Sequence, residues 1–375
     1  MTRSNDSRRA LRGARQPITG SFNLVALLLI AVVVILTLAA CGGDDEGGAP
    51  APTTAQLPTQ PGPFGVGVRQ MTFTRKSTTM PTQDRALLTD IWYPTAPNAG
   101  PTDPELGGIV NAPWAAGAAN LPVVVFSHGH CCVPQMSRFF MRAVASHGFI
   151  VAAPLHTGNL FTDPNCPSDS AAQQDSYANR PPDIMFVIDS LLQLNADSTS
   201  FFSGAINPNR IGLSGHSFGG HTALRVSAVD PRVIAGLALA PGAPLLSVLT
   251  NIHIPMMVQG GADDRATAFD LLVQPIYNHL NPPKYLVKIS HTGHTAFFDD
   301  LCYPTVPTTS APTPWCDAGG PDALTADAAH EFILRYAVPF LLHWVAGDSR
   351  FDAFLAPDPA PPGVIFTADI GAPNV

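Results

Sequence analysis

Apolar runs of the length of single β-strands recur along the chain, and turn-forming residues separate them. Several of the runs are continuous and rich in valine, which is typical of strands buried on both faces of a sheet. The pattern predicts eight strands, over residues 71–75, 86–94, 121–129, 149–156, 210–215, 233–242, 254–261 and 284–290.

Apolar residues at helical spacing occupy the segments between these strands. Helices are expected over residues 136–147, from Pro181-Pro182 onward, from 218 to about 227, and over 323–345. Strands that alternate with helices predict a mostly parallel sheet with helices on both faces. No segment is long enough for a large cap domain.

The first 40 residues have the pattern of an export signal. Five arginines precede residue 16, Phe22 to Leu38 is almost wholly apolar, and the run closes on LAAC at Cys41. This segment resembles a bacterial lipoprotein signal, in which the cysteine is lipidated and becomes the mature N-terminus. An uncleaved transmembrane helix is the alternative. Both interpretations place the remainder outside the cytoplasmic membrane, in the cell envelope, because the arginines stay inside.

The stretch after Cys41 combines GGDDEGG with a segment rich in proline and threonine, a composition that cannot bury apolar surface. The expected organisation is therefore a signal peptide at 1–40, a tether at 41–63 and a catalytic domain at 64–375. The chain has 28 acidic and 20 basic side chains, and only three are lysines. This balance argues against a nucleic-acid partner, which needs a basic face. The oligomeric state stays open.

The candidate nucleophile is Ser217, in GHSFG at residues 215–219. It stands where a buried strand ends and a helix begins, and the two glycines allow the chain to turn tightly. The serine hydroxyl would lie near the positive end of the following helix, where a developing oxyanion is stabilised. An ordinary serine in a glycine-rich turn is the alternative.

A serine hydroxyl needs a base, and the base needs an orienting acid. Downstream, one strand runs into Asp263-Asp264 and the next into His291-Thr-Gly-His294. The order serine, acid, histidine, each at the carboxyl end of a strand, is typical of α/β-hydrolases. His294 is the expected base because it lies in the loop beyond the strand, and His291 is interpreted as a structural or surface residue.

Four blocks resemble those of the platelet-activating-factor acetylhydrolases and the related bacterial lipase and polyester-hydrolase branch of the α/β-hydrolases. They are GHSFGG (215–220), FSHGH (126–130), SHGFIVAAPLH (146–156) and HTAFFD (294–299). The resemblance covers most of residues 64–345. It implies an α/β-hydrolase fold that works without a cofactor.

The resemblance also implies individual roles. Ser217 would be the nucleophile and His294 the base, and the backbone N–H groups of His130 and Phe218 would form the oxyanion hole. Phe218 and Phe297 are candidates to line an acyl pocket, with ordinary core packing as the alternative.

The acid matches the family pattern less closely. The bacterial branch commonly has GGxxD with a proline four residues later, and here Ala268 replaces that proline. Asp264 falls in the acid position and is favoured over Asp263, because only one of two consecutive residues can point into the site.

Cysteines indicate an oxidising compartment. Cys302 and Cys316 flank a proline-rich loop and are predicted to form a disulfide, while Cys166 is expected to pair with Cys131 or Cys132. No metal site is expected, because zinc ligands usually show tighter spacing with a companion acid or cysteine. The histidines considered for such a site are His128, His130, His216 and His221.

The sequence therefore predicts a lipid-anchored, extracytoplasmic serine ester hydrolase that acts on an ester or lipid substrate. A serine peptidase of the same fold is one alternative, although that branch usually carries a large cap. A non-catalytic envelope binding protein is the other, although it need not keep serine, acid and histidine at three strand ends. Segments 157–180 and 301–321 lack the amphipathic pattern of a lipase lid, which predicts an open site that favours short acyl esters.

Overall fold

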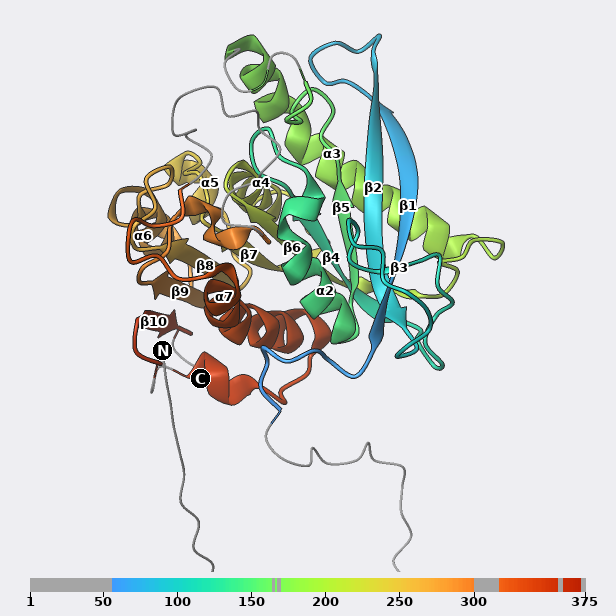
Figure 1. The fold of residues 1–375 in the computed structure, drawn as a ribbon. Helices are drawn as coiled ribbons and strands as arrows, with labels where there is room; N and C mark the ends of the chain where they lie inside the picture. The colour runs from blue at the N-terminus through green and yellow to red at the C-terminus, as the bar shows by residue number, and fades with distance from the viewer. Residues whose placement is uncertain (1–55, 164–165, 167–169, 300–316, 357–359, 372–375) are drawn as a thin grey trace, which may run out of the picture. The chain divides into compact units, whose positions relative to one another are not determined.

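Ten strands in the described part of the chain form one sheet (Figure 1). The computed structural model describes residues 56–163, 166, 170–299, 317–356 and 360–371; the expected signal peptide, Cys41, Cys302 and Cys316 lie outside these residues. The strands are β1 (Gly65–Lys76), β2 (Asp84–Thr95), β3 (Ile109–Val110), β4 (Leu121–Ser127), β5 (Ile150–Pro154), β6 (Ile206–His216), β7 (Val233–Leu239), β8 (Met256–Gly261), β9 (Lys284–Ile289) and β10 (Val364–Asp369).

The centre of the sheet is parallel. The strand order is β10-β9-β8-β7-β6-β4-β5-β2-β1-β3, and all neighbours from β9 to β5 pair in parallel. Strand β2 pairs antiparallel with β1 and β5, and β10 pairs antiparallel with β9. The predicted fold class, a mostly parallel sheet, is confirmed. The carboxyl ends of β4, β6, β8 and β9 consequently share one edge of the sheet.

Helices cover both faces of this sheet (Figure 1). They are α2 (Arg138–Ser146), α3 (Ser170–Ala196), α4 (Phe218–Ser227), α5 (Leu246–Thr250), α6 (Gln274–His279) and α7 (Ala326–Leu341). Single turns of 3₁₀ or π geometry lie at Pro134–Ser137, Phe269–Val273, His294–Phe297, Leu342–Ala346 and Asp352–Leu355.

Strand β4 shows how the apolar runs build two cores. Successive side chains of a strand point to opposite faces. Val124 and Phe126 therefore join one cluster with residues of α2 and α7, whereas Val123 and Val125 join another with residues of α3 and α4. A run that is apolar at every position is needed because both faces are buried.

Helix α3 departs from the prediction. It begins at Ser170 rather than near Pro181, so both prolines lie inside the helix. A proline lacks the N–H that would bond to the carbonyl four residues earlier. The carbonyl that Pro181 leaves unpaired belongs to Tyr177, and it accepts a hydrogen bond from Arg225 of α4 instead. A neighbouring helix thus satisfies the backbone group that the proline frees.

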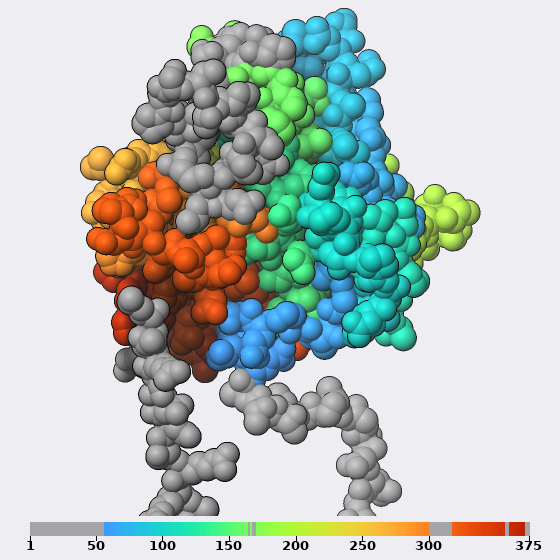
Figure 2. Space-filling model, in the orientation of Figure 1, coloured from blue at the N-terminus to red at the C-terminus, as the bar shows by residue number. Residues whose placement is uncertain are grey.

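The residues just before β1 pack against the end of α2. Gly62 donates its backbone N–H to the Ser146 hydroxyl, and Phe64 donates to the Ser146 carbonyl. On the face shown in Figure 2, this blue segment adjoins atoms of the C-terminal helical region, coloured red. Among the residues that the structure describes, no helix combines the length and apolarity needed to cross a bilayer.

Candidate active site

Ser217 stands on a sharp turn between β6 and α4. Its backbone has φ 55° and ψ −117°, a strained conformation for a residue with a Cβ. A Cβ added to Gly215 would lie 2.4 Å from the Gly219 carbonyl oxygen, and one added to Gly219 would lie 1.8 Å from that of Ser127. Only glycine fits at either position, so the spacing of GxSxG follows from how closely the strand and helix pack here.

His294 begins the single turn that follows β9, and its ring meets a carboxylate from the loop after β8. The distance from His294 Nδ1 to Asp264 Oδ2 is 2.8 Å. The Asp264 side chain is fully buried, and 14% of the His294 side chain is exposed. A buried carboxylate on Nδ1 leaves Nε2 as the nitrogen able to accept a proton.

The Asp264 carboxylate is held by further donors. Oδ1 accepts the backbone N–H groups of Ala266 and Thr267, and Oδ2 also lies 2.8 Å from the Thr267 hydroxyl. Burial by itself raises the pKa of the Asp264 carboxyl, but the hydrogen bonds from His294 and Thr267 and the nearby imidazole outweigh it, so that the pKa lies below its usual value. The carboxylate therefore stays ionised and able to orient His294.

The alternative acid, Asp263, and the other histidine after β9, His291, both lie away from this pair. Asp263 is exposed, and its backbone N–H donates to the Thr292 carbonyl. His291 is also exposed and has a φ of 56°. The structure thus brings Asp264, and neither of these residues, to His294.

Ser217 follows β6 and His294 follows β9, two strands that β7 and β8 separate in the sheet, and His216 bridges the two positions. His216, the last residue of β6, places Nε2 3.1 Å from the His294 carbonyl oxygen, and the two imidazole centroids are 4.6 Å apart. Burial and then repulsion from His294 hold the pKa of His216 well below its ordinary value, so this ring is neutral. The elbow and the Asp264–His294 pair are therefore adjoining parts of one site.

The loop after β4 passes beside the elbow. A Cβ added to Gly129 would lie 3.6 Å from the Ser217 Cβ, which places the Gly129–His130 peptide next to the serine. Phe218 is the first residue of α4, where a backbone N–H has no acceptor within its own helix. The two backbone donors expected for an oxyanion hole thus both flank Ser217.

A second serine, histidine and aspartate also form a chain of hydrogen bonds. His156 lies 3.0 Å from Asp183 through Nδ1 and 2.9 Å from the Ser127 hydroxyl through Nε2. Ser127, His156 and Asp183 are all buried. Burial and then the charge of Arg180 lower the pKa of His156 to about 4, against the opposing effect of Asp183. A serine without access to solvent cannot attack a substrate, so this set is structural.

The expected acyl pocket needs a correction. Phe297 is fully buried, belongs to the core and stacks on His216 with ring centroids 5.7 Å apart, so it does not line an open surface. The accessible aromatic group beside Phe218 is instead Tyr177 of α3, which is 39% exposed and has its ring centroid 6.3 Å away. Tyr177 was not among the candidates because the helix was predicted to begin at Pro181-Pro182, after this residue.

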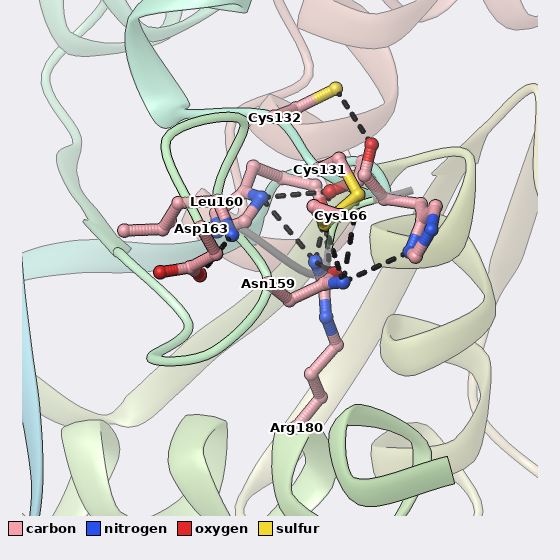
Figure 3. The surroundings of a disulfide bond; sticks show 10 residues. Cys131, Cys132, Asn159, Leu160, Asp163, Cys166 and Arg180 are labelled. Atoms are coloured by element: carbon pink, nitrogen blue, oxygen red, sulfur yellow. Dashed lines mark hydrogen bonds between the residues drawn. A yellow bond between two sulfur atoms is a disulfide. The ribbon is translucent and has the colours of Figure 1, made fainter. Parts of the chain in front are cut away.

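One disulfide adjoins the site. Cys131, directly after His130, is bonded to Cys166, and the two Cα atoms are 5.8 Å apart (Figure 3). Cys132 is a buried free thiol. The pairing left open by the sequence is therefore Cys131 with Cys166. The predicted Cys302–Cys316 bond lies outside the described residues.

A family comparison covers the segment that holds all of these groups. Residues 104–302 match the PET hydrolase-like (PETase) family model, which is more than half of the chain. The chain belongs to the PET hydrolase-like family. This agrees with the polyester-hydrolase part of the resemblance seen in the sequence, while the platelet-activating-factor acetylhydrolase branch stays a prediction.

Individual relatives are similar at low identity. Cutinase est2 of Thermobifida alba is 24% identical over 236 residues, which is 63% of this chain and 64% of the relative. Cutinase 2 of Thermobifida cellulosilytica is 23% identical over 63% of this chain and 73% of its own length. Lipase 1 of Moraxella sp. (strain TA144) is 26% identical over 189 residues, 50% of this chain and 53% of the relative. The match to the first of these cutinases thus spans slightly less than two thirds of that protein.

Proposed function

We propose that this PET hydrolase-like protein is an extracytoplasmic serine carboxylic-ester hydrolase. Ser217 attacks the ester carbonyl, His294 takes the serine proton and passes it to the leaving alcohol, and Asp264 orients the imidazole. Water then attacks the acyl-enzyme with His294 again as base. The single observation that carries the proposal is the 2.8 Å contact of the buried Asp264 carboxylate with His294, beside a serine on a strained turn.

The substrate class follows from the surface beside Ser217. Tyr177 and Phe218 offer two aromatic rings, with an interplanar angle of 24°. The area of these two rings suits a short acyl chain or an aryl ester. Each methylene that extends beyond the rings would remain in water and forgo the ~0.8 kcal/mol of full burial. The related cutinases are named for a polyester, so accessible polyester chains are candidate substrates, and truncated phospholipids are the alternative.

Steady-state hydrolysis of p-nitrophenyl esters tests this proposal. The acetate and butyrate are expected to have higher kcat/KM than the palmitate, without activation at an oil and water interface. Ser217→Ala is expected to lower kcat by about a thousandfold or more, since members of a triad act as a unit. A kcat/KM that rises steadily to palmitate, or jumps above the micellar threshold, would favour a lidded lipase instead.

The proposed location rests on the LAAC motif at Cys41 and on the Cys131–Cys166 disulfide, which suits an oxidising compartment. Metabolic labelling with an alkyne fatty acid is expected to mark the wild-type protein, and Cys41→Ala should lose the label. A wild-type protein that reaches the membrane without taking up the label would favour an uncleaved transmembrane helix.

A further inference from the structure

Arg180 of α3 is a fully buried cation that the proposed mechanism does not use. Within the described residues, no carboxylate lies within ion-pair distance of its guanidinium, and the nearby Asp183 is paired with Arg75, Arg85 and His156. Burial lowers the pKa of Arg180 to about 9, which still leaves the group charged at neutral pH. Burying a charge without an ion-pair partner is costly, so the hydrogen-bond acceptors around Arg180 indicate what it does.

The guanidinium is directed at the loop after β4. Its NH1 donates to the His128 carbonyl, and its NH2 donates to the Gly129 carbonyl at 2.8 Å. NH2 also donates to the side-chain oxygen of Asn159, whose amide nitrogen lies 2.9 Å from His130 Nδ1. Figure 3 shows the Arg180 side chain reaching Asn159 beside the Cys131–Cys166 disulfide.

His128 supplies a second donor to the same carbonyl. Its Nε2 accepts the backbone N–H of His156 at 3.0 Å, so the proton of the neutral ring is on Nδ1. Nδ1 lies 2.8 Å from the Gly129 carbonyl oxygen and donates to it. Both acceptor positions of the Gly129 carbonyl are thus occupied, one of them by a cation.

The Gly129 carbonyl and the His130 N–H belong to one planar peptide group and point in opposite directions. Fixing the carbonyl therefore fixes the direction of the N–H. A cation on the carbonyl oxygen also polarises the peptide, which strengthens the N–H as a donor, because linked hydrogen bonds reinforce one another at low dielectric. Arg180 also packs on the side chain of the residue that carries the other donor, with its guanidinium carbon 4.5 Å from the Phe218 ring centroid.

We propose that Arg180 is a positioning residue for ester hydrolysis, which orients and polarises the Gly129–His130 peptide so that the His130 N–H stabilises the oxyanion. This inference rests on the proposed function, because it assigns a role within the same site. It predicts that Arg180 contributes to the transition state and little to binding of the ground-state ester.

Arg180→Met tests the inference in the full-length protein. With p-nitrophenyl butyrate, kcat is expected to fall about 10- to 100-fold, less than for outright loss of an oxyanion donor, while KM stays within about twofold. Arg180→Lys keeps the charge but lacks the fork that reaches two carbonyls, so its kcat should fall between those of Arg180→Met and the wild type. The inhibition constant of an alkyl trifluoromethyl ketone, which forms an anionic tetrahedral adduct with the serine, should rise by the same factor as kcat falls.

Arg85→Met is the matched control. Arg85 is also a buried arginine, but its guanidinium pairs with Asp183 and does not contact the loop after β4. This variant should lower the melting temperature at least as much as Arg180→Met does, because it breaks a buried ion pair. It should leave kcat within about threefold, because it does not change the direction of the Gly129–His130 peptide.

Several results would overturn the inference. A wild-type kcat in Arg180→Met, an equal loss of kcat in Arg85→Met, or a trifluoromethyl ketone affinity that does not follow kcat would each do so. If Arg180→Met does not fold, Arg180→Lys decides the question through the same two constants. Failure of the proposed function looks different, since the wild-type protein itself would then lack esterase activity or Ser217→Ala would keep it.

Discussion

Replacing Asp264 by asparagine changes one atom and should reverse the tautomer of His294. Oδ1 accepts two backbone N–H groups, from Ala266 and Thr267, so the oxygen of an asparagine must stay on that side. The new amide NH₂ then takes the place of Oδ2, 2.8 Å from His294 Nδ1. The Thr267 hydroxyl can accept from this amide, because its own proton can turn to the Ala240 carbonyl oxygen 3.0 Å away.

An amide that donates to Nδ1 forces the histidine proton onto Nε2. That nitrogen can then no longer take the proton of Ser217, and the imidazolium loses its counter-charge. A triad with this defect loses about 10³- to 10⁴-fold in kcat, which corresponds to about 4–5 kcal/mol of transition-state stabilisation. Because the shape and the hydrogen-bond count of residue 264 are kept, KM should stay within about twofold and the near-ultraviolet circular dichroism should be unchanged.

Asp263→Asn is the matched control, because it makes the same chemical change at the adjacent, exposed position. Initial rates with p-nitrophenyl butyrate across a range of concentrations give kcat and KM for both variants. Asp263→Asn is expected to keep kcat within about twofold, as for a surface substitution. A crippled Asp263→Asn protein, or an Asp264→Asn protein with more than a tenth of wild-type kcat, would refute the assignment of the acid.

Three further outcomes are expected. Cys166→Ser opens the loop closed by Cys131 over a sequence separation of 35, which should lower the free energy of unfolding by about 4 kcal/mol in guanidinium titrations. Gly219→Ala should yield little folded protein in solubility and circular dichroism assays, since its Cβ would lie 1.8 Å from the Ser127 carbonyl oxygen. The melting temperature should fall as the pH drops from about 6.5 to 4, because buried histidines such as His156, with a pKa of about 4, are neutral in the fold and protonated in the unfolded chain.

Each of these outcomes has a control. Reduction of the wild-type protein should reproduce the effect of Cys166→Ser, and an unchanged unfolding midpoint under reducing conditions would contradict it. Gly242→Ala should be tolerated, because the nearest atom to its added Cβ is 3.8 Å away, and equal damage from both glycine variants would contradict the packing argument. A melting temperature that stays constant between pH 6.5 and 4.5 would contradict the pH argument.

The central strands were predictable because burial on both faces leaves a continuous apolar run, as in Val123 to Phe126. Ser217 was predictable for a related reason, since the flanking glycines record a close approach of backbones that no other residue permits. The order of serine, acid and histidine along the chain then located the other two groups at the same edge of the sheet.

Other features depend on contacts that a linear pattern does not record. The early start of α3 depends on Arg225, a residue of α4, because Arg225 donates a hydrogen bond to the Tyr177 carbonyl. Phe297 has the same residue type whether it lines a pocket or fills the core, and only the packing against His216 decides. Arg180 lies between a polar segment and two prolines, so nothing local distinguishes it from a surface arginine.

Labelling with a fluorophosphonate tests the central claim most directly, because the reagent requires an activated serine and no knowledge of the substrate. We predict one label on each wild-type molecule, located by mass spectrometry of the tryptic peptides on Ser217 and not on the buried Ser127. Ser217→Ala should abolish the labelling while the protein stays folded. Labelling that persists on another serine in this variant, or a folded wild-type protein that takes up no label, would contradict the assignment of Ser217 as the nucleophile.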